Sequence, residues 1–325
     1  MSPKGRPEGE SAPKRVSAEG NPVSPMGRPE GESGPKRVSA EGGPVTAPAC
    51  STVASPRTAA SYKSSYKPIW CPGCGDFSVL SSITKALAQL DLPPERVAVV
   101  SGIGCSSRIP AYTTCYGFHG VHGRSLAAAT GLKVARPDLT VLVTGGDGDG
   151  YSIGGNHFLH ACRRNVDMTY VVMDNHVYGM TKGQPSPTTE PDWDSKLAPG
   201  GTGLRVFHPL VVALASGANF VARGFAGDPN GTARIIAEAI RHPGFSFVEV
   251  LSPCVTFRPE QREWKGAVRP APVDPTDDAA TAARRLMTDD GFNIGILYAG
   301  DRPAYRGYPQ PARETPTDLE AEFEL

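Results

Sequence analysis

Four short apolar runs, rich in β-branched residues, constrain the fold of this chain more than any other feature. They cover residues 97–101, 139–144, 168–173 and 245–251, and each is bounded by polar, Gly or Pro residues. Strands that are buried on both faces of a parallel sheet have this pattern. We therefore expect the four runs to be central strands of one sheet.

Helical patterns lie between and around these runs. Apolar residues recur at helical spacing between residues 76 and 90, where Asp76 suits the N-cap position. Further helices are expected at 124–135, 155–164, 209–222 and 231–241. Strands that alternate with helices predict an α/β fold with a largely parallel sheet and helices on both faces. Ligands of such sheets bind beyond the carboxyl ends of the strands.

The first sixty residues differ in composition from the rest. They contain no Phe, Trp, Tyr, Leu or Ile, but ten Pro and eight Gly, so they cannot bury enough apolar surface to offset the entropy of ordering. Residues 5–20 recur at 27–42 with one change, a duplication with a period of 22 residues. We expect residues 1–60 to be a disordered low-complexity tail, with Met26 as an alternative start.

Charge and hydropathy argue against several classes of protein. The 33 Lys and Arg residues balance 33 Asp and Glu residues, whereas binding nucleic acid requires a basic excess. No run of about 18 apolar residues predicts a membrane span. No apolar stretch follows the initial charges, so no secretory signal is expected. An odd count of seven Cys then argues against a disulfide framework, and we expect a cytoplasmic protein.

Two polar loops follow two of the predicted strands. Residues 145–150 read Gly-Gly-Asp-Gly-Asp-Gly, and Asp174 and Asn175 follow the next strand. Glycines let a backbone approach a diphosphate closely, and Asp147 and Asn175 offer the hard oxygen ligands that suit Mg²⁺. A strand-to-helix turn would use the same residue types. Gly-Asp-Gly followed by 25 residues and then Asp174-Asn175 resembles the thiamine diphosphate motif.

Four cysteines stand where they could share one centre. Cys71 and Cys74 form a Cys-x-x-Cys pair before a helix, and Cys105 and Cys254 each follow a strand closely. The pair alone also fits a thioredoxin-like redox site or a zinc knuckle, and a single buried thiol can be inert. Four thiolates suffice for a 4Fe-4S cluster or for a zinc site. The spacing does not separate these two possibilities.

These motifs occur in an order that is typical of one family. The chain resembles the β subunit of the 2-oxoacid:ferredoxin oxidoreductases, and most of all the 2-oxoglutarate branch. The resemblance covers about residues 62–270, with a weaker echo at 295–298. The matching segments are residues 70–75, 102–107, 119–124, 146–149, 155–158, 174–175, 178–184 and 252–254.

The resemblance implies a cofactor-binding domain and assigns its ligands. Residues 61–270 would form a thiamine-diphosphate-binding domain. Residues 1–60 and the stretch after 270 depart from the family, and we expect 271–325 to be a C-terminal extension that packs on the partner subunit. Cys71, Cys74, Cys105 and Cys254 would ligate one 4Fe-4S cluster. Asp147, Asn175 and the carbonyl of Val177 would hold Mg²⁺. The residues implied to line thiamine diphosphate are Ile103, Gly104, Cys105, Ser106, His122, Gly146, Asp147, Gly148, Asp149, Asn175, Val177, Gly179, Met180 and Thr181.

The implied activity is oxidative decarboxylation of 2-oxoglutarate to succinyl-CoA and CO₂, with electrons passing through the cluster to ferredoxin. Pyruvate or another 2-oxo acid is the alternative substrate. An iron–sulfur electron-transfer or scaffold subunit without thiamine chemistry, or a zinc-stabilised binding module, is the alternative function. In this family the glutamate that activates the cofactor lies on the α subunit, so we expect activity only in an αβ or α2β2 complex. Coenzyme A and ferredoxin would be the further partners.

Three residues are candidates for a direct role in catalysis. Arg108 follows Cys105 by three residues, and its guanidinium could pair with the distal carboxylate of 2-oxoglutarate. The resemblance adds His122, and Lys182 could contact the substrate. The other histidines considered, which show no ligand spacing and are expected to be structural, are His119, His157, His160 and His176.

Overall fold

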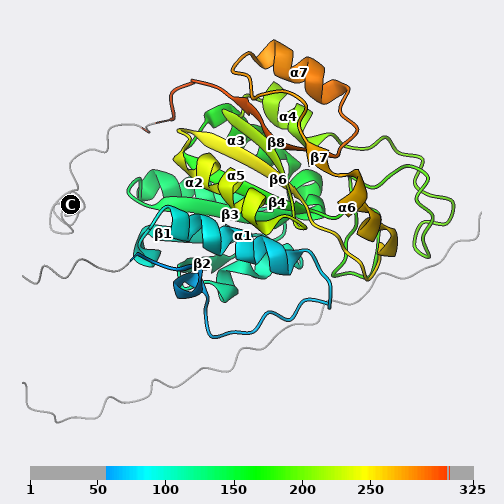
Figure 1. Cartoon of the computed structure of the whole chain (residues 1–325), viewed down its shortest axis with the longest axis horizontal. Coiled ribbons are helices and arrows are strands. Elements are labelled where there is room, and N and C mark those ends of the chain that lie inside the picture. Colours follow the sequence, from blue (N-terminus) through cyan, green and yellow to red (C-terminus); the bar gives the residue numbers. More distant parts are fainter. Residues whose placement is uncertain (1–55, 306, 308–325) are drawn as a thin grey trace, which may run out of the picture. The chain divides into compact units, whose positions relative to one another are not determined.

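The four apolar runs form adjacent parallel strands at the centre of an eight-stranded sheet. In the computed structural model, which describes residues 56–305 and Gly307, these are β1 (Val97–Ser101), β3 (Thr140–Gly146), β4 (Met168–Asp174) and β6 (Phe245–Leu251). The strand order is β2-β1-β3-β4-β6-β5-β8-β7 (Figure 1). Only the pairing of β5 with β8 is antiparallel in this described sheet. The predicted α/β fold with a largely parallel sheet is therefore confirmed.

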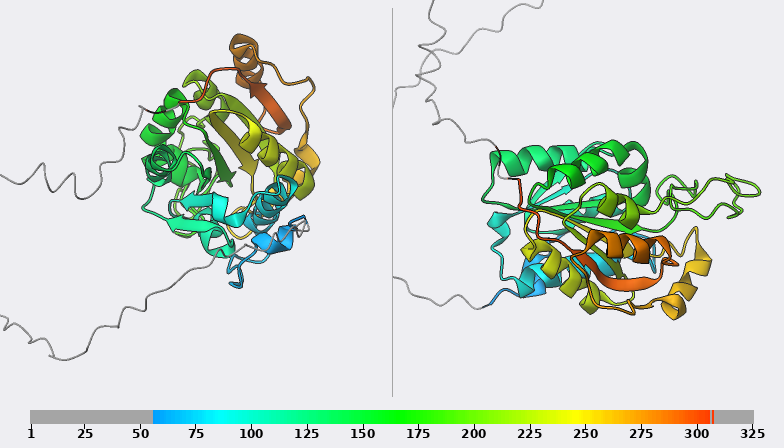
Figure 2. Two further views of the ribbon diagram at one scale, coloured as in Figure 1. Left: turned by 90° about the vertical axis from the view of Figure 1, so that its left-hand side faces the viewer. Right: turned by 90° about the horizontal axis from the view of Figure 1, so that it is seen from above.

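Helices cover both faces of the sheet because successive residues of each buried strand point to opposite sides. Val97 and Val99 of β1 join the core on one face, beneath α1 (Asp76–Gln89) and α5 (Pro229–Arg241). Ala98 and Val100 join the core on the other face. That second face is covered by α2 (Ser125–Ala135), α3 (Gly155–Arg164), α4 (Pro209–Ala215) and α7 (Ala279–Met287), and Figure 2 shows both layers.

Two details of the predicted helices are wrong. The helix expected over 209–222 ends at Ala215, because Gly217 adopts a φ of +92° that stops it, and β5 (Phe220–Phe225) begins instead. Asp76 is not an N-cap: Gly75 takes that position, and Asp76 is the first residue of α1, with only 1% of its surface exposed. Its carboxylate accepts a hydrogen bond from the Ser252 hydroxyl at 2.9 Å.

The sheet continues beyond the domain boundary that was placed at residue 270. After β7 (Arg269–Pro270) and α7, β8 (Asn293–Ala299) pairs antiparallel with β5 and contains the echo at 295–298. At the other end, Tyr62 is fully buried and donates a hydrogen bond to the Leu92 carbonyl at 2.6 Å. The predicted tail and its duplication lie, up to residue 55, outside the described residues.

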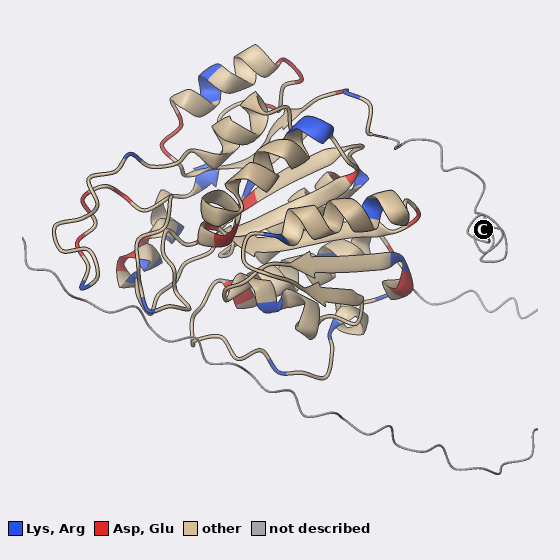
Figure 3. Ribbon diagram, turned by 180° about the vertical axis from the view of Figure 1, so that it is seen from behind, with Lys and Arg blue, Asp and Glu red and all other residues tan. Residues whose placement is uncertain are grey.

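The remaining strand, β2 (Tyr116–His119), lies at one edge of the sheet with all four residues exposed. Lys and Arg are interspersed with Asp and Glu over the side of the molecule seen in Figure 3. Among the described residues, no helix is both long and apolar enough to cross a membrane. The long segment between β4 and α4, which carries several residues of the site described next, projects from the body of the fold (Figure 2).

Candidate cofactor site

A cavity of about 220 Å³ lies beyond the carboxyl ends of β1, β3 and β4. Its walls are the loops that follow these three strands, together with His122 from the loop after β2. Every residue that was implied to line the cofactor lines this cavity, and Met173 and Tyr178 complete the wall. The structure therefore brings together side chains that are up to 78 positions apart in the sequence, from Ile103 to Thr181.

Gly148 of the wall and Gly102, which directly precedes the wall residue Ile103, have no room for a side chain. A Cβ on Gly148 would overlap the ring of Tyr178, and one on Gly102 would overlap the carboxylate of Asp149. The hydroxyl of Tyr178 donates to the Gly148 carbonyl at 3.3 Å. The Gly/Asp loop therefore packs directly on the loop after β4 and leaves its backbone exposed to the cavity, as binding a diphosphate requires.

Asp149 joins the loops on one side of the cavity. Its Oδ1 accepts hydrogen bonds from the backbone N–H groups of Ile103 at 2.9 Å and Gly123 at 2.7 Å, and lies 2.8 Å from Nδ1 of His122. Asp149 is 3% exposed, and its Oδ2 has no hydrogen-bond partner among the described residues. Because the carboxylate only accepts, Nδ1 of His122 donates, and Nε2 is left free for another partner.

Buried oxygen atoms also lie at the ends of β3 and β4. Asp147 is 2% exposed, and burial raises the pKa of its carboxyl group. The Thr188 hydroxyl lies 3.3 Å from Oδ2 of Asp147 and 2.7 Å from Oδ1 of Asp174. Burial first, and then the neighbouring Asp147, raise the pKa of Asp174 well above its usual value. A divalent cation would offset the cost of these buried carboxylates.

The other atoms predicted to bind Mg²⁺ lie in the loop after β4. Oδ1 of Asn175 accepts a hydrogen bond from the Val177 N–H at 3.1 Å, and both residues line the cavity with Asp147. Within residues 56–305, no three His, Cys, Asp or Glu side chains are close enough to hold one ion. A cation here would therefore depend on the Asn175 amide and the Val177 carbonyl, which are hard oxygen donors that fit Mg²⁺.

The four cysteines predicted as cluster ligands come from three loops near the same edge. Cys71 is exposed, the other three are partly buried, and all four thiols are free. Burial raises the pKa of Cys105 to about 11, and Asp76, Cys254 and Cys71 add to that shift. Sγ of Cys254 lies near the cavity wall, 3.3 Å from the position that a Cβ on Gly179 would take. Cysteines bind iron as thiolates, so iron binding at these four residues would release protons.

Arg108 and Lys182 do not line the cavity, unlike His122. Arg108 lies half-buried in the 3-10 helix that follows Cys105 (Ser106–Tyr112), two residues beyond Ser106, which lines the cavity. Lys182 is exposed, with a φ of +78°, in a turn where its N–H donates to the Gly179 carbonyl at 3.2 Å. Both side chains therefore border the site and do not belong to the wall.

Sequence reasoning missed Met173, Tyr178, Thr188 and Gln261. Met173 directly precedes Asp174 and Tyr178 directly follows Val177, so their place beside the motif could have indicated them. Thr188 and Gln261 lie in irregular segments whose sequence carries no periodicity, and only the folded chain brings them to Asp147 and Asn175.

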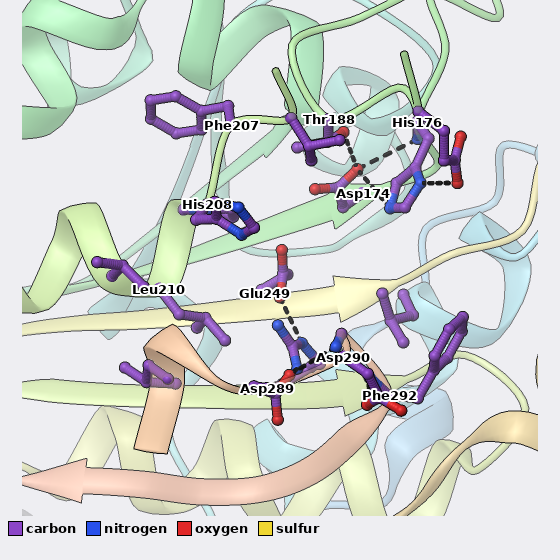
Figure 4. Close-up of a pocket in the computed structure, with 18 residues that line it drawn as sticks. Asp174, His176, Thr188, Phe207, His208, Leu210, Glu249, Asp289, Asp290 and Phe292 are labelled. Carbon is purple, nitrogen blue, oxygen red and sulfur yellow. Dashed lines mark hydrogen bonds and ion pairs between the residues drawn. The ribbon is translucent and has the colours of Figure 1, made fainter. Parts of the chain in front are cut away.

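A second cavity, of about 310 Å³, has Asp174 and Thr188 in its wall (Figure 4). Its wall includes a buried ion triad: Nε of Arg223 lies 2.6 Å from Oε2 of Glu249, and Nη1 lies 2.6 Å from Oδ1 of Asp289. This cavity was not predicted. Arg223 directly follows the segment expected to be a helix (209–222), and Asp289 lies in the segment expected to be a C-terminal extension (271–325).

Comparison with known proteins extends these observations. The model of the thiamine pyrophosphate enzyme C-terminal TPP-binding domain matches residues 102–250. The 2-oxoacid:ferredoxin oxidoreductase 1 subunit beta of Aeropyrum pernix is 45% identical over 257 residues, which are 74% of this chain and 81% of that protein. The 2-oxoglutarate oxidoreductase subunit KorB of Mycobacterium tuberculosis is 45% identical over 206 residues, 63% of this chain, and the match spans only 55% of that relative.

A solved structure is similar as well. It is the 2-oxoglutarate:ferredoxin oxidoreductase from Magnetococcus marinus with 2-oxoglutarate, coenzyme A and succinyl-CoA bound. Its matching chain is 43% identical, with a TM-score of 0.74, and the match covers 77% of this chain and 87% of that one.

Proposed function

Since this chain belongs to the family of 2-oxoacid:ferredoxin oxidoreductase β subunits, we propose that it carries out oxidative decarboxylation of 2-oxoglutarate to succinyl-CoA and CO₂. Electrons would leave through a 4Fe-4S cluster to ferredoxin. The observation that carries the proposal is the single cavity whose wall contains every implied cofactor contact and also Cys105, a proposed cluster ligand.

The residues present fit thiamine diphosphate and Mg²⁺. The loop at Gly146 and Gly148 would hold the diphosphate with backbone N–H groups, and Asp147, Asn175 and the Val177 carbonyl would hold the cation. When bound, thiamine diphosphate supplies a carbon nucleophile and an electron sink for loss of CO₂. Nε2 of His122 can hold or accept a proton at the cavity wall, because Asp149 fixes the ring through Nδ1.

One observation favours a 4Fe-4S cluster over a single zinc ion at the four cysteines: Cys105 lines the cavity itself. A cluster held there would lie next to the substrate, where an electron acceptor is needed.

The experiment that tests the function is anaerobic co-purification of the chain with its α subunit. We expect viologen reduction that depends on coenzyme A and is faster with 2-oxoglutarate than with pyruvate. A preference for pyruvate would keep the chemistry and change the substrate. A complex that holds cluster and thiamine diphosphate but reduces viologen with neither substrate would direct the search to other 2-oxo acids. A complex that lacks both would refute the proposal and leave a scaffold role.

Substrate selection gives the first prediction. Arg108→Ala should raise the KM for 2-oxoglutarate by about 10-fold or more, because a bond between charged groups contributes about 1.5–3 kcal/mol. The KM for pyruvate, which has no distal carboxylate, should change little. Steady-state kinetics of the complex on both substrates measure the ratio, with Arg234→Ala, an exposed arginine of α5, as the control. Equal effects on the two substrates would exclude Arg108 as the carboxylate contact.

Dependence on a partner gives the second prediction. The purified chain alone should reduce viologen at no measurable rate, because in this family the activating glutamate lies on the α subunit and no glutamate is among the described residues that line the cavity. The exposed side chains of Tyr116, Phe118 and Val121, which are 58%, 55% and 71% accessible beside the loop of His122, support a subunit contact there. Adding the α subunit should restore activity, in an αβ or α2β2 complex that sedimentation would distinguish. Activity of the isolated chain would contradict the prediction.

A further inference from the structure

One buried side chain connects the loop of Cys254 to the loop of Asn175. Gln261, 1% exposed, lies in the 3-10 helix Pro259–Glu263 that follows the Cys254 loop. Its Oε1 accepts a hydrogen bond from the Cys254 N–H at 2.8 Å, and its Nε2 donates to the Asn175 carbonyl at 2.7 Å. Both distances are those of good hydrogen bonds.

The bridge uses both ends of the amide, so no shorter or charged residue could replace it in both bonds. Asparagine would be one carbon short, and glutamate has no N–H to donate to a carbonyl. Arg258, 3% exposed, makes a parallel connection from the same segment: its Nη1 donates to the His176 carbonyl at 3.1 Å. The segment after Cys254 is thus anchored to two consecutive carbonyls of the loop after β4.

We infer that Gln261 is a positioning residue that sets the Cys254 thiol and the Asn175 ligand relative to each other. The inference rests on the proposed function, in which Cys254 binds the cluster and Asn175 binds Mg²⁺. Hydrogen bonds near the cluster sulfurs and the orientation of ligands adjust reduction potential and metal affinity. In the wild type the Cys254 N–H is engaged by Gln261 and is therefore not available to a cluster sulfur.

The test uses Gln261→Leu in the complete complex, because leucine is close in size and can make neither bond. We expect the dissociation constant of thiamine diphosphate with Mg²⁺ to rise about 5-fold, the effect of one buried hydrogen bond of about 1 kcal/mol. We also expect the midpoint potential of the cluster, followed by EPR during redox titration, to rise as the freed N–H turns toward cluster sulfur. Gln89→Leu, at an exposed position of α1, is the matched control and should change neither value.

A second variant separates the bridge from a general loss of folding. In its ionised form, Gln261→Glu can still accept from the Cys254 N–H but cannot donate to the Asn175 carbonyl. At a pH where the new carboxyl is ionised it should therefore weaken binding of thiamine diphosphate, with full iron content retained. If the wild type holds both cofactors and Gln261→Leu moves only one of the two measurements, or neither, the inference is overturned. A wild-type complex that holds neither cofactor would instead overturn the proposed function.

Discussion

Cys105→Ala is expected to abolish viologen reduction by the complex, with a loss greater than the roughly 100-fold that changes around a metal site cause. The physical reason is that the substitution removes one of the four proposed cluster ligands, the one that lines the cavity. Thiamine diphosphate should still bind, because the indole N–H of Trp70 donates to the carbonyl of residue 105 at 2.8 Å and holds the loop whatever the side chain.

The measurements are iron content, the visible absorbance of the cluster, and calorimetric binding of thiamine diphosphate. Cys115→Ala is the matched control, since Cys115 is also a free and largely buried thiol but packs in the core under α1. It should keep its iron and its activity. A Cys105→Ala complex that retains iron and wild-type rates would show that the fourth ligand is another residue, and zinc in place of iron would favour the binding-module alternative.

The four central strands could be predicted, because a strand buried on both faces appears in the sequence as a continuous apolar run. Each run is also bounded by polar, Gly or Pro residues. β5 could not, because residues 209–222 continue an apolar pattern that reads as helix, and only the left-handed backbone of Gly217 separates the two elements. β8 was missed for a different reason. It is an antiparallel strand near the sheet edge whose residues are all half-buried, so its sequence does not show the continuous apolar run of a central strand.

The candidate site was predictable where chemistry depends on residue type and spacing. The Gly/Asp loop, Asn175, Cys105 and Cys254 all follow strands, and parallel strands bring their carboxyl ends to one edge. The contacts that connect these loops were not predictable, because Asp149 and Gln261 act through hydrogen bonds to backbone groups, and backbone groups have no sequence signature. The position of Arg108 outside the wall depends on the 3-10 helix after Cys105, which its Ser- and Pro-containing sequence did not reveal.

The largest effect on stability is expected for Arg223→Ala, which should lower the free energy of unfolding by about 3–5 kcal/mol. The side chain is 8% exposed and pairs with Glu249 on β6 and with Asp289 in the loop before β8. Its removal leaves two buried carboxylates without a counter-ion at the wall of the second cavity (Figure 4). Calorimetry should show a melting temperature lower by roughly 6–20 °C for a chain of this size.

The loss of stability predicted for Arg223→Ala comes from the burial of the ion pairs and not from their number. A second, exposed arginine tests this explanation. Arg96 pairs with Asp138 at 2.7 Å, a distance close to that in the Arg223 pairs, but its side chain is 56% exposed. Arg96→Ala should therefore cost less than about 1 kcal/mol. If both variants lose the same stability, water must reach the triad through the second cavity. The triple variant Arg223→Met, Glu249→Leu, Asp289→Leu removes all three charges together. If an unpaired buried charge causes the loss of stability, this variant should lose far less stability than Arg223→Ala.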